Sequence, residues 1–273
     1  MQLKMSETPE ADQTRVEAAG EAPSQIERVA AALREKLLRG EFPPGQRLAE
    51  LTLVPQLNAS RTPVRLALER LAHQGLLDAL PHGGFRVREF TISDIWDAIE
   101  IRGVLEGTAA RLAAERLGDP AECQALRRRH EAFAETPPMD MDGFLHYVEK
   151  NRAYHRELWK LAKSPSLERA LEGVCALPFA DPGAIVFGDP VDAQNYHARN
   201  VAIAIEQHGT ILEAIENREG TRAEAIAREH SRLTRNNLDW ALRNRELLQH
   251  FPGGPLIAFP VEGQAKALRG KRI

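Results

Sequence analysis

NASRTPVRLALERLAHQGLL, residues 58–77, decides the fold at the N-terminal end of this chain of 273 residues. Apolar residues recur in it at three- and four-residue steps, which is the spacing of a helix with one buried face. Thr62 directly before Pro63 fits a helix N-cap followed by proline in the first turn, and Gln74-Gly75 fits the end. We therefore expect a helix here with an exposed polar face. The apolar positions are Val64, Leu68 and Leu71.

The sequence on both sides of this helix completes a small domain. Ser24 and Glu27 form a capping-box pattern that starts a helix ending near Gly40, and a second short helix is expected over residues 49–57. After the decisive stretch, residues 76–80 and 85–88 flank the tip PHGG and predict a β-hairpin. Three helices followed by a hairpin form the winged helix-turn-helix arrangement, in which the third helix enters the major groove of DNA.

The third helix and the hairpin tip carry residues suited to DNA. Arg61 and Arg65 are four residues apart and share a helix face, from which guanidinium groups can reach phosphates or guanine edges. Ser60 and Thr62 add hydroxyl groups near the helix start, where the helix dipole favours a phosphate. At the predicted wing tip, His82 and the adjacent glycines, beginning with Gly83, allow the backbone to approach DNA closely.

Composition sets the remaining limits. The whole chain has a formal charge of -3, but residues 24–89 contain ten Lys/Arg against seven Asp/Glu, so this part is modestly basic. No apolar run is long enough to span a bilayer, and two cysteines are too few for a disulfide framework, so a cytoplasmic location without membrane contact is expected. The predicted organisation is a disordered tail (1–23), a winged helix-turn-helix domain (24–89), an all-helical domain (91–250) and a flexible tail (251–273).

The second domain has a helical periodicity interrupted by polar residues on its inward stripes. Six helices are expected, with a loop over residues 178–192. Burying a polar group without a partner costs a few kcal/mol, so inward polar residues must meet one another, water or a ligand. The helices are expected over residues 93–117, 119–135, 141–162, 166–177, 194–217 and 221–248, and the inward polar residues include Arg102, Asn151, His155, His208 and His230.

Three imidazoles and one oxygen donor make a plausible metal site. Asn151 and His155 are four residues apart on one helix and can reach the same ion. His208 and His230 come from two further helices. Zinc, nickel or manganese would all accept such ligands. For any one of these histidines, burial as an ordinary hydrogen-bonded core residue is the competing interpretation.

Two groups of motifs resemble a known family. LLRGEFPPGQRLAE, NASRTPVRLALERLAHQGLL and PHGGFRV are similar to the GntR family of bacterial transcriptional regulators. EIRGVLE (residues 100–106), NRAYHREL, EQHGTILEAIE and AEAIAREH resemble the effector domain of its FadR-type branch, called FCD. The resemblance implies a mainly helical protein, with a bundle of six to seven helices behind the winged domain. It also implies that the residues at Arg61, Arg65, His82 and Gly83 lie on or near operator DNA.

The same resemblance implies a function. It assigns the metal to Asn151, His155, His208 and His230, and a small carboxylate effector to the metal and Arg102. The expected protein is a homodimeric repressor that binds double-stranded operator DNA under control of that effector, and is not an enzyme. Two alternatives stay open at this point: a metal-dependent hydrolase, for which Glu106 is the only candidate base, and a DNA-binding dimer without an effector.

Three residues depart from the family pattern. Asn151 stands where aspartate is common, and a neutral carboxamide binds a cation more weakly than a carboxylate does. Leu51 stands where arginine is frequent, and Leu66 where an acidic residue is usual. We therefore expect a weaker metal site, or one that depends more on an anionic ligand, and an operator that cannot be inferred by analogy.

Overall fold

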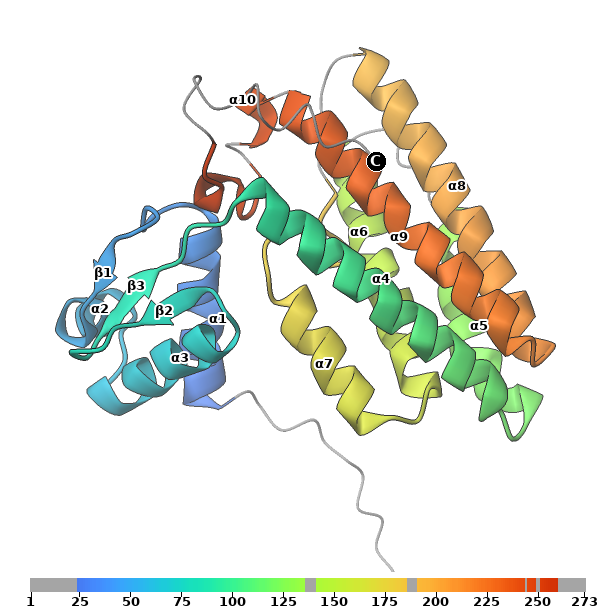
Figure 1. Cartoon of the computed structure of the whole chain (residues 1–273), viewed down its shortest axis with the longest axis horizontal. Coiled ribbons are helices and arrows are strands. Elements are labelled where there is room, and N and C mark those ends of the chain that lie inside the picture. The colour runs from blue at the N-terminus through green and yellow to red at the C-terminus, as the bar shows by residue number, and fades with distance from the viewer. Residues whose placement is uncertain (1–23, 136–140, 186–190, 244, 249–250, 260–273) are drawn as a thin grey trace, which may run out of the picture.

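A computed structural model describes residues 24–135, 141–185, 191–243, 245–248 and 251–259. Its N-terminal part is a winged helix-turn-helix unit, drawn in blue to cyan in Figure 1. The first helix has Ser24 as its N-cap, which forms the predicted capping box with Glu27. The elements of this unit are α1 (Gln25–Leu38), β1 (Arg47–Leu48), α2 (Glu50–Gln56), α3 (Arg61–His73), β2 (Leu77–Ala79) and β3 (Phe85–Val87).

Helix α3 starts earlier than its sequence suggests. Its N-cap is Ser60, so Thr62 and Pro63 lie inside the first turn instead of forming the cap and the first helical position. Proline is tolerated there because the first-turn amides have no partner within the helix. The buried face contains Val64, Leu68 and other apolar residues, as the periodicity predicts.

The wing is part of a three-stranded sheet. Its order is β1-β3-β2, with both pairings antiparallel, so the predicted hairpin gains a third strand at one edge. Strand β1 was not expected, because two residues are too short to show an alternating pattern. The tip contains Gly83 and Gly84 with φ of 85° and 86°, a conformation that favours glycine.

The remainder of the described chain is helical, and the mainly helical fold is confirmed. Helix α4 (Ile92–Glu115) and helix α9 (Gly220–Arg243) pack closely side by side in the bundle (Figure 1). Gly103 and Gly107 make this possible, because a Cβ on either would collide with Ser231 or Arg228 of α9. The other elements are η1 (Pro120–Cys123), α5 (Gln124–Glu131), η2 (Ala132–Glu135), α6 (Met141–Leu161), α7 (Pro165–Cys175), α8 (Val191–Glu216), α10 (Arg245–Leu248) and η3 (Gly254–Leu256).

The C-terminal segment 251–258 differs from the flexible tail that the sequence suggests there. Leu256 and Ile257 are buried in the same apolar cluster as the core of the winged domain. Phe90, between the two domains, forms a parallel bridge with Ile257. The composition of PGGP (residues 252–255) predicts a loop, but its glycines permit this segment to pack closely against its neighbours. The expected tails at residues 1–23 and 260–273 lie outside the described residues.

Candidate functional site

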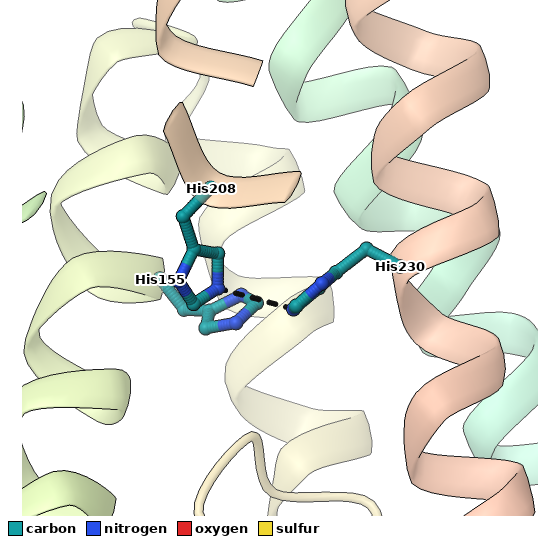
Figure 2. A group of neighbouring side chains, drawn as sticks. All are labelled: His155, His208 and His230. Atoms are coloured by element: carbon teal, nitrogen blue, oxygen red, sulfur yellow. Dashed lines mark hydrogen bonds between the residues drawn. The ribbon is translucent and has the colours of Figure 1, made fainter. Parts of the chain in front are cut away.

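Three imidazoles from three helices meet inside the bundle. His155 of α6, His208 of α8 and His230 of α9 are all buried, and their candidate ligand nitrogens lie within 4.8 Å of one another. Figure 2 shows the three rings turned toward one another. The Nε2 atoms of His208 and His230 are 3.1 Å apart, so one of them carries the proton that they share. This is the grouping that the inward stripes predicted.

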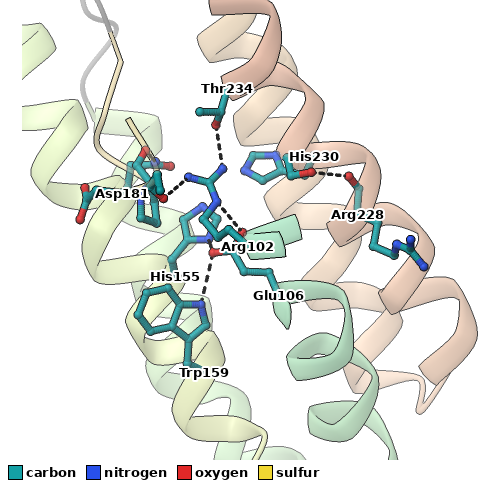
Figure 3. Close-up of polar contacts among 12 residues, drawn as sticks. Arg102, Glu106, His155, Trp159, Asp181, Arg228, His230 and Thr234 are labelled. Atoms are coloured by element: carbon teal, nitrogen blue, oxygen red, sulfur yellow. Dashed lines mark hydrogen bonds and ion pairs between the residues drawn. The ribbon is translucent and has the colours of Figure 1, made fainter. Parts of the chain in front are cut away.

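Arg102 and Glu106 form a buried ion pair beside the triad (Figure 3). The carboxylate of Glu106 lies 2.7 Å from His155 Nδ1 and 3.4 Å from Arg102 Nε, and it accepts a hydrogen bond from Trp159 Nε1. Each of these three partners is a hydrogen-bond donor or a cation, so their contacts offset the negative charge of the buried carboxylate. Burial raises the pKa of Glu106, but His155 and Arg102 more than offset this and bring it to about 2. Glu106 is therefore ionised.

Two acceptors orient the imidazoles. Glu106 faces Nδ1 of His155, and Gln207 Oε1 lies 3.0 Å from Nδ1 of His230. An acceptor at Nδ1 holds the proton on that nitrogen and leaves the lone pair on Nε2, as in many metal-binding histidines. In His230 that lone pair accepts the proton of His208 Nε2. The sequence did not assign these roles. Glu106 had one signal, its position one turn from Arg102, and Gln207 had none.

Two of the buried histidines, His208 and His230, are held neutral. Burial and then the neighbouring His155 lower the pKa of His230 to about 3. Burial, followed by His230 and His155, also lowers the pKa of His208 well below its usual value. Neutral imidazole is the form that binds a metal ion, so the environment keeps these two ligands in the binding form.

Asn151 is oriented by a backbone carbonyl. Its Nδ2 donates a hydrogen bond of 2.7 Å to the carbonyl oxygen of Pro182. A carbonyl can only accept, so the amide orientation is unambiguous. Its Oδ1 is buried without a hydrogen-bond partner among the described residues. A buried oxygen left unpaired costs free energy that a cation would recover.

A cavity of about 40 Å³ opens beside this group. It is lined on one side by Arg102, Asn151, His155 and His230. The lining therefore offers an oxygen, two imidazoles and a guanidinium to a small ligand. Arg102 is anchored there by donating to Ala180 O at 2.9 Å and to Thr234 Oγ1 at 2.7 Å. The donor set fits a borderline divalent ion, because imidazole nitrogen with one oxygen suits zinc, nickel and manganese.

The second candidate site is the exposed face of α3. Arg61 and Arg65 are 71% and 63% exposed in their side chains and point away from the core. Each is paired with a carboxylate, Arg61 with Glu50 and Arg65 with Glu69, both at 3.1 Å. Exposed pairs of this kind contribute little free energy, so either arginine can exchange its partner for a phosphate or a base.

Other predicted DNA-facing residues surround these arginines. Ser60 and Thr62 are exposed at the start of α3, and His82 and Gly83 are exposed at the wing tip. Leu51 and Leu66, two of the three departures from the family pattern, are also exposed, at 70% and 36%.

Comparison with known proteins decides the class. The pattern described as "Bacterial regulatory proteins, gntR family" matches residues 25–87, and the pattern of the "FCD domain" matches residues 97–233. The chain belongs to the GntR family. Its FCD domain places it in the FadR-like branch, and GntR proteins of this kind are transcriptional regulators, so the hydrolase alternative is set aside.

Individual relatives agree with this. The chain is 35% identical over 135 residues to a "Probable D-xylose utilization operon transcriptional repressor" of Paenarthrobacter nicotinovorans, spanning 50% of the chain and 58% of that relative. It is 24% identical over 220 residues to the "HTH-type transcriptional repressor RspR" of Escherichia coli, spanning 76% of the chain and 90% of RspR. The solved structure of E. coli McbR/YncC has the same fold, with a TM-score of 0.56 at 22% identity over 82% of this chain and 99% of that one.

One further observation concerns location. Within the part of the chain that the structure describes, no helix is both long and apolar enough to cross a membrane.

Proposed function

We propose that this GntR protein is a cytoplasmic, homodimeric repressor whose affinity for operator DNA is set by a divalent metal ion and a small carboxylate effector bound in the FCD bundle. One observation carries the proposal. His155, His230, Asn151 and the buried Arg102 line one small cavity. His208 completes the histidine triad beside it, and Asn151 Oδ1 is buried without a hydrogen-bond partner among the described residues. Repression is supported by the D-xylose utilization and RspR relatives, which are both described as repressors.

The charges around the cavity favour an anionic effector. Arg102 and Glu106 offset each other, and Asn151, His208 and His230 are neutral ligands, so a divalent ion would leave an excess of positive charge in a buried place. A carboxylate would supply the compensating charge and the missing metal ligand. When bound, the metal would serve as a Lewis-acidic anchor for that carboxylate. Zinc, nickel and manganese remain equivalent candidates.

The DNA contacts are assigned to the exposed face of α3 and to the wing. Arg61 and Arg65 would contact bases or phosphates, Ser60 and Thr62 would contact phosphates at the helix start, and the wing tip at His82-Gly83 would follow the backbone or minor groove. Two copies related by a two-fold axis would place two α3 helices on a pseudo-palindromic operator.

The outer face of α4 is the surface we assign to the second copy. Ile101 and Val104 are 49% and 39% exposed on that face, three residues apart and therefore neighbours on the helix. Apolar side chains this large gain from being covered. The assignment leaves α3 and the wing, which belong to the other domain, free for DNA.

The test combines selection of DNA with matched variants. Random double-stranded DNA is enriched on the full-length protein, and the selected site is titrated by fluorescence anisotropy. Arg61→Ala combined with Arg65→Ala should weaken binding by about 100-fold or more, because each lost base contact costs about 1–3 kcal/mol. Arg70→Ala, an exposed arginine farther along α3, is the matched control and should bind nearly as the wild type does. Equal loss in both variants would contradict the assignment.

The effector part of the proposal is tested by a separate experiment. The same DNA titration is repeated with metal-stripped protein, with zinc- or nickel-loaded protein, and with loaded protein plus a panel of small carboxylates. We expect at least one carboxylate to lower DNA affinity only when metal is present. A protein that selects DNA but responds to no metal and no carboxylate would instead be a DNA-binding dimer without an effector.

A further inference from the structure

The segment Ala176–Pro182, which follows α7 and is called here the 176–182 segment, touches both the metal site and the DNA-binding domain. On the site side, three successive residues of the segment are held by buried or half-buried side chains. Ala180 O accepts from Arg102, and Pro182 O accepts from Asn151. Between them, the carboxylate of Asp181 accepts from Arg152 Nε at 2.6 Å.

The other end of the segment contacts the DNA-binding domain directly. Arg34 of α1 donates through Nη2 to Ala176 O at 2.6 Å, although the two residues are 142 positions apart. The side chain of Leu177 lies close to Gly75, immediately after α3, since a Cβ on that glycine would be 3.3 Å from Leu177 Cδ2. The segment thus contacts both α1 and the end of the helix that we assign to DNA.

A second route passes through the C-terminal segment 251–258. Phe179 stacks on Phe251, with ring centroids 5.1 Å apart. Gly253 donates its backbone N–H to Leu38 O at the end of α1, at 2.7 Å, and a Cβ on Gly253 would lie 2.8 Å from Cβ of Pro178. In Figure 1 the red turn η3 accordingly lies against the upper end of α1.

We propose that the 176–182 segment transmits occupancy of the metal site to the DNA-binding domain, and that Asn151 is the residue that couples the two. The inference rests on the proposed function, because it takes the cavity beside Asn151 as the place where a metal binds. Asn151 suits this role because its side chain lines the cavity and its two polar atoms differ in their partners. The nitrogen donates to Pro182 O of the segment, and the oxygen is buried without a hydrogen-bond partner among the described residues.

Metal binding changes the strength of the hydrogen bond from Asn151 to Pro182 O. Coordination of Oδ1 fixes the Asn151 side chain and draws electron density from the carboxamide, which makes its N–H a stronger donor to Pro182 O. A carboxylate bound to Arg102 acts in the opposite sense, because it competes with Ala180 O for the guanidinium. Metal therefore tightens the 176–182 segment, and the contacts with α1 and residues 251–258 pass the restraint on.

The test uses hydrogen–deuterium exchange of the full-length protein with and without zinc or nickel alone, after metal binding has been measured by calorimetry. In the wild type, metal should slow exchange at least about threefold in peptides covering residues 176–185 and 251–258 and the end of α1. A wild type that binds metal with unchanged exchange in residues 176–185 overturns the inference and leaves the metal site standing. A wild type that binds no metal overturns both.

Asn151→Asp separates binding from coupling. The carboxylate keeps an oxygen ligand and adds a charge, so metal affinity should be equal or higher, but it has no N–H for Pro182 O and repels that carbonyl. Metal should then bind without slowing exchange in residues 176–185. Protection equal to that of the wild type would overturn the role given to Asn151.

A second pair of variants tests the contact between the 176–182 segment and α1 and leaves the residues of the metal site unchanged. Arg34→Met removes the donor to Ala176 O and keeps an apolar stem of similar length, and Arg28→Met, on an exposed position of the same helix, is the matched control. Arg34→Met should retain metal binding and the protection of residues 176–185, but lose about half or more of the metal effect at the end of α1. Full transmission in Arg34→Met, or equal loss in Arg28→Met, overturns the proposed route even if Asn151→Asp fails to fold.

Discussion

Acidification should destabilise the FCD bundle through the neutral His208 and His230. His208 and His230 have lowered pKa values in the folded protein, that of His230 at about 3, whereas an unfolded histidine titrates near pH 6.5. As the pH falls below about 6.5, His208 and His230 become protonated in the unfolded chain but stay neutral in the folded bundle. Stability is therefore complete above the unfolded pKa and falls with decreasing pH until the folded pKa values are reached.

The expected size follows from this linkage. Each histidine that stays neutral in the folded state costs about 2 kcal/mol of stability at pH 5, because pH 5 lies about 1.5 units below the unfolded pKa and each unit is worth about 1.4 kcal/mol. Two such histidines cost about 4 kcal/mol. Glu106, with a pKa of about 2, stays ionised at pH 5 and adds almost nothing in this interval. A loss of about 4 kcal/mol is a large part of the total stability of an ordinary domain.

Tryptophan fluorescence during urea unfolding measures this directly. Trp159 of α6 is buried in the core of the bundle, and Trp96 of α4 and Trp240 of α9 pack against the apolar cluster shared with the winged domain, so the signal reports the bundle and its junction with that domain. The free energy of unfolding is compared at pH 7.5 and pH 5.0 in chelator, so that no metal contributes.

Variants connect the pH dependence to the named groups. The double variant His208→Asn, His230→Asn should remove most of the difference in unfolding free energy between pH 7.5 and pH 5.0, whatever its effect on stability at pH 7.5. His73→Gln, at an exposed position on α3, should leave the difference unchanged. A wild-type loss below about 1 kcal/mol, or a loss that survives in the double variant, would refute the reasoning.

Three further outcomes follow from the bundle. Glu106→Gln should weaken zinc or nickel binding about 10–100-fold by calorimetry, since the imidazole it orients loses a charged acceptor; unchanged affinity would contradict that role. Gly103→Ala should lower the free energy of unfolding of the bundle by about 1–3 kcal/mol in thermal or urea unfolding, because the new Cβ collides with Ser231. Gly173→Ala, which meets nothing within 4 Å, should instead raise it by up to about 1 kcal/mol. Ile101→Asp should convert the dimer to a monomer in light scattering, and a persisting dimer would place the interface elsewhere.

Periodicity predicted the helices well, because each buries one face and its apolar residues must recur at helical spacing. It also predicted that His155, His208 and His230 point inward, since they replace apolar residues on those stripes. Local signals were less reliable at element ends. Thr62-Pro63 looked like a cap, but Ser60 lies at the N-cap and the proline is accommodated within the first turn. Strand β1 was missed because a two-residue strand has no period.

Residues whose roles depend on tertiary contacts were harder to find. Glu106 is charged, and a charged helical residue is normally exposed, so only its distance of one turn from Arg102 hinted at burial. Gln207 has a role only because α8 and α9 bring it to His230. The carbonyls of Ala180 and Pro182 carry no signature at all, because every residue has one.

Asn151 shows how the structure changes the interpretation of a single substitution. From sequence, an amide in place of a carboxylate means a weaker ligand for a cation. In the fold, the same amide performs two tasks that a carboxylate cannot combine, because only the amide can present an oxygen to the cavity and donate to Pro182 O. The hydrogen bond to Pro182 O is thus the contact through which we propose that an occupied site acts on the 176–182 segment. In that mechanism an aspartate at this position would bind a cation more tightly but transmit its binding less.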